Sequence, residues 1–416
     1  MSNFLERLEI NMEKKIFSFL LVFFIIFLGI DIVSIILIQL PTPGFPVIYG
    51  YVLPLIIVLI FAGAFVDRAR RSWFLLLLIP ESLLTFVLAF NIGNSAVEWI
   101  LWPFIGILSA FTIVGMLAFF ADITKMDQRG KIAGVVTGIA CIAGAAVLSW
   151  FSSTLFSAIG LMIVFAVVKL IGAAISLYML FAKTEESIDT VPTVDAEGRS
   201  IFDVIGESFS FVWDNPKFRT YLISFALIFL AQGILVPIGG AGQTTIQLYQ
   251  AMASIGFAAA ALFLIISGPL LDKGRKQIVI YGAILAIISF LSYFFPVGAV
   301  FLAGFAVLLV AIIIVISDIS PPDRRARYFS VFLSFILAMF FVGYLIGAAL
   351  APSPWIALTG VIISGIAFVL IYLWGEETNL EEVTFPTSPA PFTISTPPPS
   401  TSDDEDNHLV PPSVED

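Results

Sequence analysis

The stretch Gly63-Ala-Phe-Val-Asp67-Arg68-Ala-Arg70-Arg71 stands directly after the second long apolar segment of the chain. The stretch Gly268-Pro-Leu-Leu-Asp272-Lys273-Gly-Arg275-Lys276 repeats its pattern, G-x-x-x-D-[RK]-x-R-[RK], after a later apolar segment. The two leading glycines are 205 positions apart. A pattern that recurs at one large offset indicates an internal duplication, so the chain is expected to contain two copies of one structural unit.

A second pair of stretches repeats in the same way, with the shared pattern D-I-[ST]-x-x-D-x-R-x-[KR]. The two copies are Asp122-Ile-Thr-Lys-Met-Asp127-Gln-Arg129-Gly-Lys131 and Asp318-Ile-Ser-Pro-Pro-Asp323-Arg-Arg325-Ala-Arg327. They are 196 positions apart and follow the fourth and tenth apolar segments, whereas the first pair follows the second and eighth. Two matches in register indicate repeats whose equivalent segments cross in the same direction.

The apolar segments predict membrane-spanning helices. Hydrophobic residues make up 59% of the 416 residues and charged residues only 12%, about half the charged share of a soluble domain. Each segment is close to the ~20 residues that cross a bilayer as a helix, and none alternates as a barrel strand would. We therefore expect an all-α membrane protein with twelve transmembrane helices in two parallel six-helix repeats. The expected spans are 16–40, 46–66, 73–92, 98–121, 132–152, 157–182, 218–238, 247–271, 277–295, 298–317, 328–350 and 354–374.

The basic residues predict the orientation of these spans. Nineteen of the 20 Lys and Arg residues lie before the first span or in connections that follow even-numbered spans. The exception is Lys169, inside the sixth span. Because basic loops face the cytoplasm, the sequence predicts a multi-pass protein of the cell membrane with both termini in the cytoplasm.

Four regions are expected along the chain. Residues 1–182 and 218–374 form the two six-helix bundles, and residues 183–217 form a cytoplasmic linker between them. Residues 375–416 are rich in Pro, Ser, Thr and acidic residues, a composition typical of a disordered tail. This tail holds ten acidic residues and no basic ones, which accounts for the whole formal net charge of −10.

The linker contains an amphipathic pattern that predicts a helix. Apolar residues recur at helical spacing, with Asp203 and Glu207 between them. Two placements stay open: the helix lies on the membrane surface, or it packs against the cytoplasmic ends of the spans. The apolar residues are Ile201, Phe202, Ile205, Phe209 and Val212.

The composition also excludes several kinds of chemistry. The chain has one cysteine, Cys141, and one histidine, His408, which lies in the polar tail. An internal disulfide and a Cys/His metal site are therefore impossible. We expect no enzyme activity, no cofactor and no metal, and no basic surface suggests a nucleic-acid partner.

Twelve spans, a six-plus-six repeat and the duplicated loop together resemble the major facilitator superfamily over residues 14–374. The resemblance implies a transporter, expected as a monomer, in which spans one, four, seven and ten line a central cavity. The two halves of such a protein rock to expose the cavity to each side in turn. The approach to span seven, from Phe202 to Arg219, is also similar to that of macrolide, tetracycline and siderophore exporters, and to that of a related lysophospholipid transporter. Span five departs from their antiporter signature, because it has Gly134, Gly138 and Gly144 but no Gly-Pro pair.

The resemblance further implies that the loop after span two is a conformational latch. Asp67 and Asp272 fall at helix C-terminal ends, where the helix dipole disfavours a negative charge, so they require cationic partners. The alternative is that the basic residues only set the topology. The residues assigned to the latch are Gly63, Asp67, Arg68, Arg71, Gly268, Asp272, Lys273, Arg275, Asp122, Arg129, Asp318 and Arg325.

Four polar residues inside the expected spans are candidates for proton or substrate binding, because an unpaired charge there is costly. Asp31 lies in span one, where a carboxylate at low dielectric binds a proton more readily; it could also simply reach headgroup water. Glu81 in span three and Lys169 in span six form either a structural ion pair or a relay. Gln232 in span seven lies near the repeat equivalent of Asp31.

These observations favour a secondary active exporter of a hydrophobic or amphipathic small molecule. Coupling to protons stays open. The alternatives are an uptake carrier for a small nutrient and a lysophospholipid flippase; a receptor that does not transport is more remote. Apart from the substrate and protons, the expected partner is the lipid bilayer.

Overall fold

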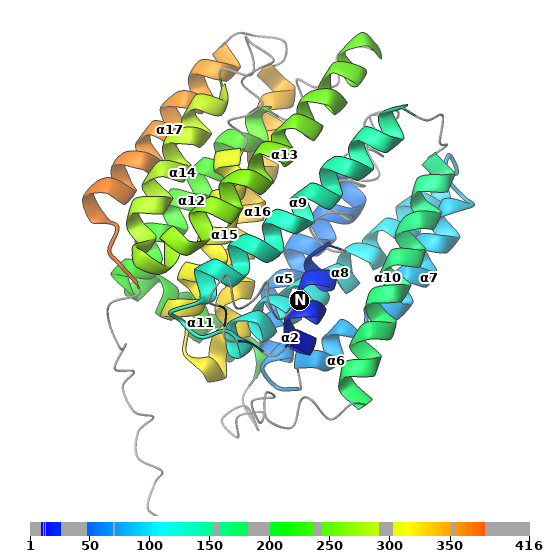
Figure 1. Cartoon of the computed structure of the whole chain (residues 1–416), viewed down its shortest axis with the longest axis horizontal. Helices are drawn as coiled ribbons and strands as arrows, with labels where there is room; N and C mark the ends of the chain where they lie inside the picture. Colours follow the sequence, from blue (N-terminus) through cyan, green and yellow to red (C-terminus); the bar gives the residue numbers. More distant parts are fainter. Residues whose placement is uncertain are drawn as a thin grey trace, which may run out of the picture. The chain divides into compact units, whose positions relative to one another are not determined.

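The chain folds into a bundle of helices (Figure 1). The computed structural model describes residues 10, 12, 14–25, 48–69, 71–153, 158–181, 200–235, 243–290, 303–350 and 355–378. Residues 1–381 form one compact unit, and the regular structure in its described parts is helical throughout. The predicted all-α fold class is confirmed. Asp31 and the acidic tail beyond residue 378 lie outside the described residues.

The helices follow one another in the order that the apolar segments predict. Five elements are short. They are α2 (Lys14–Phe24), the π-helical turn η2 (Ile48–Val52), α6 (Arg71–Leu75), α7 (Leu78–Ala89) and the 3-10 turn η7 (Pro322–Arg324). The longer helices are α5 (Leu53–Val66), α8 (Ser95–Ile123), α9 (Arg129–Ser153), α10 (Ala158–Phe181), α11 (Ile201–Asp214), α12 (Pro216–Leu235), α13 (Gln243–Lys273), α14 (Arg275–Ser289), α15 (Ala303–Ile319), α16 (Arg325–Leu350) and α17 (Trp355–Trp374).

Many of these helices suit a bilayer. Among the described residues, seven helical segments are long and apolar enough to cross a membrane, judged by length and composition. Three further apolar segments are shorter. Large apolar side chains remain exposed along them, for example Ile57 on α5 and Tyr372 on α17. Such surfaces are stable against lipid rather than water, so the chain is a multi-pass membrane protein.

The third expected span is divided into α6 and α7. Pro80 lies in the first turn of α7 and lacks an N–H, so it cannot donate a hydrogen bond to the carbonyl of Leu76. Its ring also crowds that carbonyl, and the chain forms a turn at residues 76–77. Pro103 lies inside α8 without dividing it.

The two sequence halves meet along two helix pairs. The most extensive contact in the bundle is between α9 of the first half and α13 of the second, and α5 packs similarly against α16. Figure 1 shows α9 and α13 side by side. Since α5 and α13 are repeat equivalents, as are α9 and α16, the two contacts are copies of one another.

Glycines permit the close approach in both pairs. A Cβ atom on Gly134 of α9 would lie 2.7 Å from the Cα of Gly268 on α13. A Cβ atom on Gly63 of α5 would lie 2.6 Å from the Cα of Arg327 and the Cβ of Ser330, both on α16. Distances this short exclude any larger side chain unless the helices move apart.

The linker helix α11 packs on the bundle with one face. Ser200 caps its start, accepting a hydrogen bond from the backbone nitrogen of Phe202 at 3.3 Å. The helix contacts α5, α12 and α16, with Val204 and Val212 fully buried. The opposite face exposes Phe202 and Trp213. Of the two placements that the sequence leaves open, packing against the spans is therefore present, and the aromatic face stays available to the surroundings.

Candidate functional site: a charged latch between the halves

The turns after α5, α8, α13 and α15 meet at one end of the bundle, which we call the charged end. Asp67, just after α5, accepts hydrogen bonds from the backbone nitrogens of Ala326 (3.1 Å) and Arg327 (3.0 Å). These nitrogens belong to the first turn of α16, where N–H groups have no partner within the helix and the dipole favours an anion. The Nε atom of Arg327 also lies 3.4 Å from Asp67. A carboxylate of the first half thus caps a helix of the second half.

Asp272, the repeat equivalent of Asp67, makes the corresponding contact at the end of α13. Its two oxygens accept hydrogen bonds from the backbone nitrogens of Gly130 (2.6 Å) and Lys131 (2.8 Å), in the first turn of α9. The Nη1 atom of Arg275 lies 3.1 Å from the same carboxylate. Here a carboxylate of the second half caps a helix of the first half.

The offsets between these contacts equal those of the sequence repeats. Asp67 and Asp272 differ by 205 positions, while Gly130 and Ala326 differ by 196. The duplicated motifs therefore meet each other: the loop after span two binds the start of span eleven, and the loop after span eight binds the start of span five. Both contacts join residues of different halves, and both would break if the charged end opened.

A second set of charges adjoins the capping carboxylates, since Arg275 contacts both Asp272 and Asp318. Arg129 Nη1 lies 2.5 Å from Asp318 Oδ1, and Arg325 Nη1 lies 2.7 Å from Asp122 Oδ1. These two ion pairs are again repeat equivalents and again cross between the halves. Arg275 adds a third cation, with its Nε atom 2.9 Å from Asp318 Oδ2.

These charges are buried, so their pairing is essential. Arg275 is fully buried, and Arg129 and Asp318 are each 3% exposed. Arg129 also donates from Nη2 to the carbonyls of Ala121 (2.9 Å) and Thr124 (3.0 Å), and from Nε to the Thr124 hydroxyl (3.1 Å). Removing one partner of such a pair costs about 3–5 kcal/mol, since it leaves an uncompensated charge in a poorly solvated place.

The structure thus brings together most residues assigned to the latch from sequence. Arg68 lies in the turn after α5, Arg71 begins α6, and Lys273 ends α13 with an exposed side chain. Arg327, which the sequence did not assign to the latch, contacts Asp67 through its backbone nitrogen and its Nε atom. Its position in the repeated D-x-R-x-[KR] pattern was the available signal.

The intramembrane candidates lie elsewhere. Lys169 Nζ on α10 lies 2.6 Å from Glu81 Oε1 on α7, and Ser109 of α8 donates to the same oxygen at 2.7 Å. Glu81 is fully buried and Lys169 is 5% exposed. Gln232 on α12 donates to Ser289 of α14 at 3.2 Å. The first group therefore connects three helices of the first half, and the second connects two helices of the other half.

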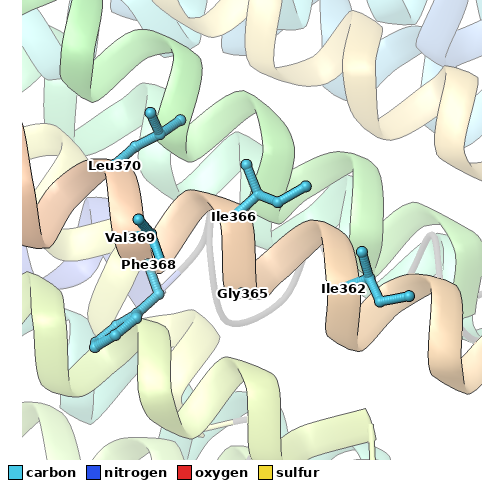
Figure 2. A pocket seen from close by; sticks show the side chains of 6 residues that line it. All are labelled: Ile362, Gly365, Ile366, Phe368, Val369 and Leu370. Atoms are coloured by element: carbon cyan, nitrogen blue, oxygen red, sulfur yellow. The ribbon is translucent and has the colours of Figure 1, made fainter.

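A recess of about 510 Å³ lies along α17 (Figure 2). It is lined by Ile362, Gly365, Ile366, Phe368, Val369 and Leu370, all from this one helix. Figure 2 shows Ile362 and Ile366 on one side of the helix and Phe368 on another. Because it is apolar and Ile362 and Ile366 are about half exposed, the recess belongs to the lipid-facing surface rather than to the latch.

Comparison with known proteins places the fold. Residues 221–399 match the family model described as Major Facilitator Superfamily, and none of the curated proteins matches the chain in sequence. A bacterial homologue of the iron transporter ferroportin, in its outward-facing state, superposes with a TM-score of 0.62 at 13% identity, over 88% of this chain and 99% of that one. The human organic anion transporter TETRAN superposes with a TM-score of 0.63 at 14% identity, over 86% of this chain and 100% of that one. The transporter FucP in its outward conformation superposes with a TM-score of 0.63 at 13% identity, over 86% of this chain and 98% of that one. The chain therefore has the major facilitator fold.

Proposed function

We propose that this protein is a secondary active transporter that works by alternating access, with the charged end as one of its two gates. One observation carries the proposal: each half supplies a carboxylate that caps a helix of the other half, through Asp67 and Asp272. In alternating access the two halves move as units, so contacts that cross between them form together and break together. They are the kind of bistable element that alternating access requires.

The strength of the latch suits a reversible gate. A hydrogen bond to a charged group contributes about 1.5–3 kcal/mol, and a charge at a helix end about 0.3–2 kcal/mol. Part of this is lost to desolvation, and water replaces the contacts when the gate opens. The remaining preference for the closed state is within the range that substrate or ion binding can reverse.

The proposal includes an orientation. The positive-inside rule puts the charged end in the cytoplasm. With that end closed, the arrangement described here would exchange substrate with the opposite side. The outward-facing states of two of the similar structures agree with this assignment.

The substrate is proposed to be hydrophobic or amphipathic, and the direction to be export. Helices α8, α12 and α15 correspond to spans four, seven and ten. Their charged residues lie only toward the helix ends: Glu98, Asp122, Lys217, Arg219 and Asp318. Apart from Asp31 in span one, the lining spans therefore carry few fixed charges, which offers little to a sugar or a carboxylate and more to an apolar compound. Import of a small nutrient and flipping of a lysophospholipid are the competing outcomes.

A two-step experiment tests the function. Purified protein is first screened by thermal shift against hydrophobic drugs, sugars, carboxylates and lysolipids. Stabilising compounds are then loaded into proteoliposomes, and their flux is followed with and without a proton gradient. We expect an amphipathic compound to cross faster than in empty liposomes. Flux equal to that of empty liposomes for every class would overturn the proposal.

A matched pair of variants connects the flux to the latch. Asp67→Asn together with Asp272→Asn should alter the flux, because it removes both capping charges. Asp127→Asn makes the same chemical change at an exposed position of the charged end and should not.

A further inference from the structure

The segment that follows the last spanning helix returns to the charged end of the second half. After α17 ends at Trp374, the chain makes no regular structure through Thr378, yet Gly375 and Thr378 are buried. The backbone oxygen of Glu376 accepts a hydrogen bond from the Tyr221 hydroxyl at 2.5 Å. A carboxylate oxygen of Glu376 also lies 3.2 Å from Lys217 Nζ. Residues 375–378 are therefore held in place, although the composition of the tail predicts disorder from residue 375.

Two side chains of this segment reach the latch. Glu377 Oε2 accepts a hydrogen bond from the backbone nitrogen of Lys276 at 3.1 Å, in the first turn of α14. The Thr378 hydroxyl donates to Asp318 Oδ2 at 3.3 Å. Thr378 is only 4% exposed, so its hydroxyl is committed to this partner. Asp318 is the anion that pairs with Arg129 of the first half and Arg275 of the second.

These contacts fix Asp318 from the side opposite to the first half. Its Oδ2 receives Arg275 and Thr378 from its own half, which leaves Oδ1 directed at Arg129. Glu377 holds the start of α14, the helix that carries Arg275 in its first turn. A carboxylate held by two donors loses little further freedom when the third arrives, so the docking of Arg129 is favoured by preorganisation.

We propose that Thr378 is a positioning residue of the latch, and that residues 375–378 form a clip that sets Asp318 for closure of the charged end. This inference rests on the proposed gating function. It assigns the start of the tail to the working unit, and it leaves the remaining tail, from residue 383 on, dispensable for the gate.

The test uses the full chain with Cys141→Ser and spin labels at Lys125→Cys and Gln277→Cys. These positions are exposed at the charged end, one in each half. The distance between labels is measured by pulsed electron paramagnetic resonance in lipid nanodiscs. We expect Thr378→Val to raise the ratio of long to short distances by up to about fivefold, the change that corresponds to the whole of one hydrogen bond of about 1 kcal/mol. Thr378→Ser, which keeps the hydroxyl, should behave like the parent.

Two truncations and one latch variant complete the test. A chain ending at Gly375 should match or exceed Thr378→Val, and a chain ending at Glu382 should match the parent. The clip alone would be overturned if the distance distribution of Thr378→Val equals that of the parent while that of Asp272→Asn shifts toward long distances. If Asp272→Asn also leaves the distances unchanged, the gating proposal and the clip fall together.

Discussion

Arg129 and Asp318 form an ion pair of 2.5 Å although 189 residues separate them in sequence. Its repeat equivalent, Asp122 with Arg325, stands at 2.7 Å. Two ion pairs that are related by the sequence repeat and that both join the two halves are not expected of a fold without internal duplication. They follow directly if the two halves are copies that meet face to face, each presenting the same anion and the same cation to the other.

Removing the Arg129 guanidinium should destabilise the protein. Arg129→Gln leaves Asp318 paired with Arg275 alone among the cations described above and removes the donor to the Thr124 carbonyl, so the free energy of unfolding should fall by up to about 3–5 kcal/mol. Arg129→Lys should recover only part of this lost stability, because an ammonium cannot reach several acceptors in one plane. The melting temperature in detergent measures the effect. Lys125→Gln, at an exposed position of the same turn, is the control; an equal drop for both would contradict the buried pair.

The glycine contacts predict a packing effect on gating. Gly134→Ala adds a Cβ that would lie 2.7 Å from Gly268, and overpacking of this kind costs about 1–3 kcal/mol. The chain's single cysteine, Cys141, is buried and lies three residues beyond Gly138, on the same stripe of α9 as Gly134. Its labelling rate with N-ethylmaleimide should rise about tenfold for each 1.4 kcal/mol by which closure is weakened.

The control for that experiment is Gly365→Ala on α17, where a Cβ meets nothing within 4 Å. Alanine favours a helix over glycine by about 1 kcal/mol, so neither substitution should weaken its own helix. Unchanged labelling in Gly134→Ala would show that α9 and α13 do not close the charged end.

The sequence predicted which residues belong to the charged cluster better than how they pair: Asp67 contacts Arg327 of the other half, a cation that the sequence did not assign to it. The duplicated motifs indicated which loops correspond, because repeats preserve offsets. They could not indicate that Asp67 and Asp272 bind backbone N–H groups, since a helix start offers such groups whatever its side chains. Thr378 carried no pattern at all: its role depends on where the chain runs after Trp374. The division of span three could not be predicted although its proline is visible in the sequence. Pro103 lies within α8 without dividing it, so an intramembrane proline does not by itself indicate a break.

The buried pair of Glu81 and Lys169 predicts a non-additive pair of substitutions. Glu81→Gln leaves the Lys169 ammonium without its anion and should lower the melting temperature strongly. Adding Lys169→Met removes the unpaired charge, so the double variant should be more stable than the single one. If the double variant melts at or below the single one, the pair is not what stabilises α7 against α10.

Asp31 remains the candidate for proton coupling, outside the described residues. Asp31→Asn keeps size and polarity but cannot ionise. We expect it to abolish uphill transport driven by a proton gradient while substrate binding, measured by thermal shift, persists. Wild-type accumulation or extrusion against a gradient by this variant would show that protons do not act through Asp31.

The proposed gate between the halves is closed by the capping carboxylates Asp67 and Asp272. The most direct measurement is the distance between spin labels at Lys125→Cys and Gln277→Cys, in the Cys141→Ser background, with and without Asp67→Asn and Asp272→Asn together. We expect one dominant short distance in the parent and a second, longer population in the double variant. Identical distance distributions in the two proteins would contradict it.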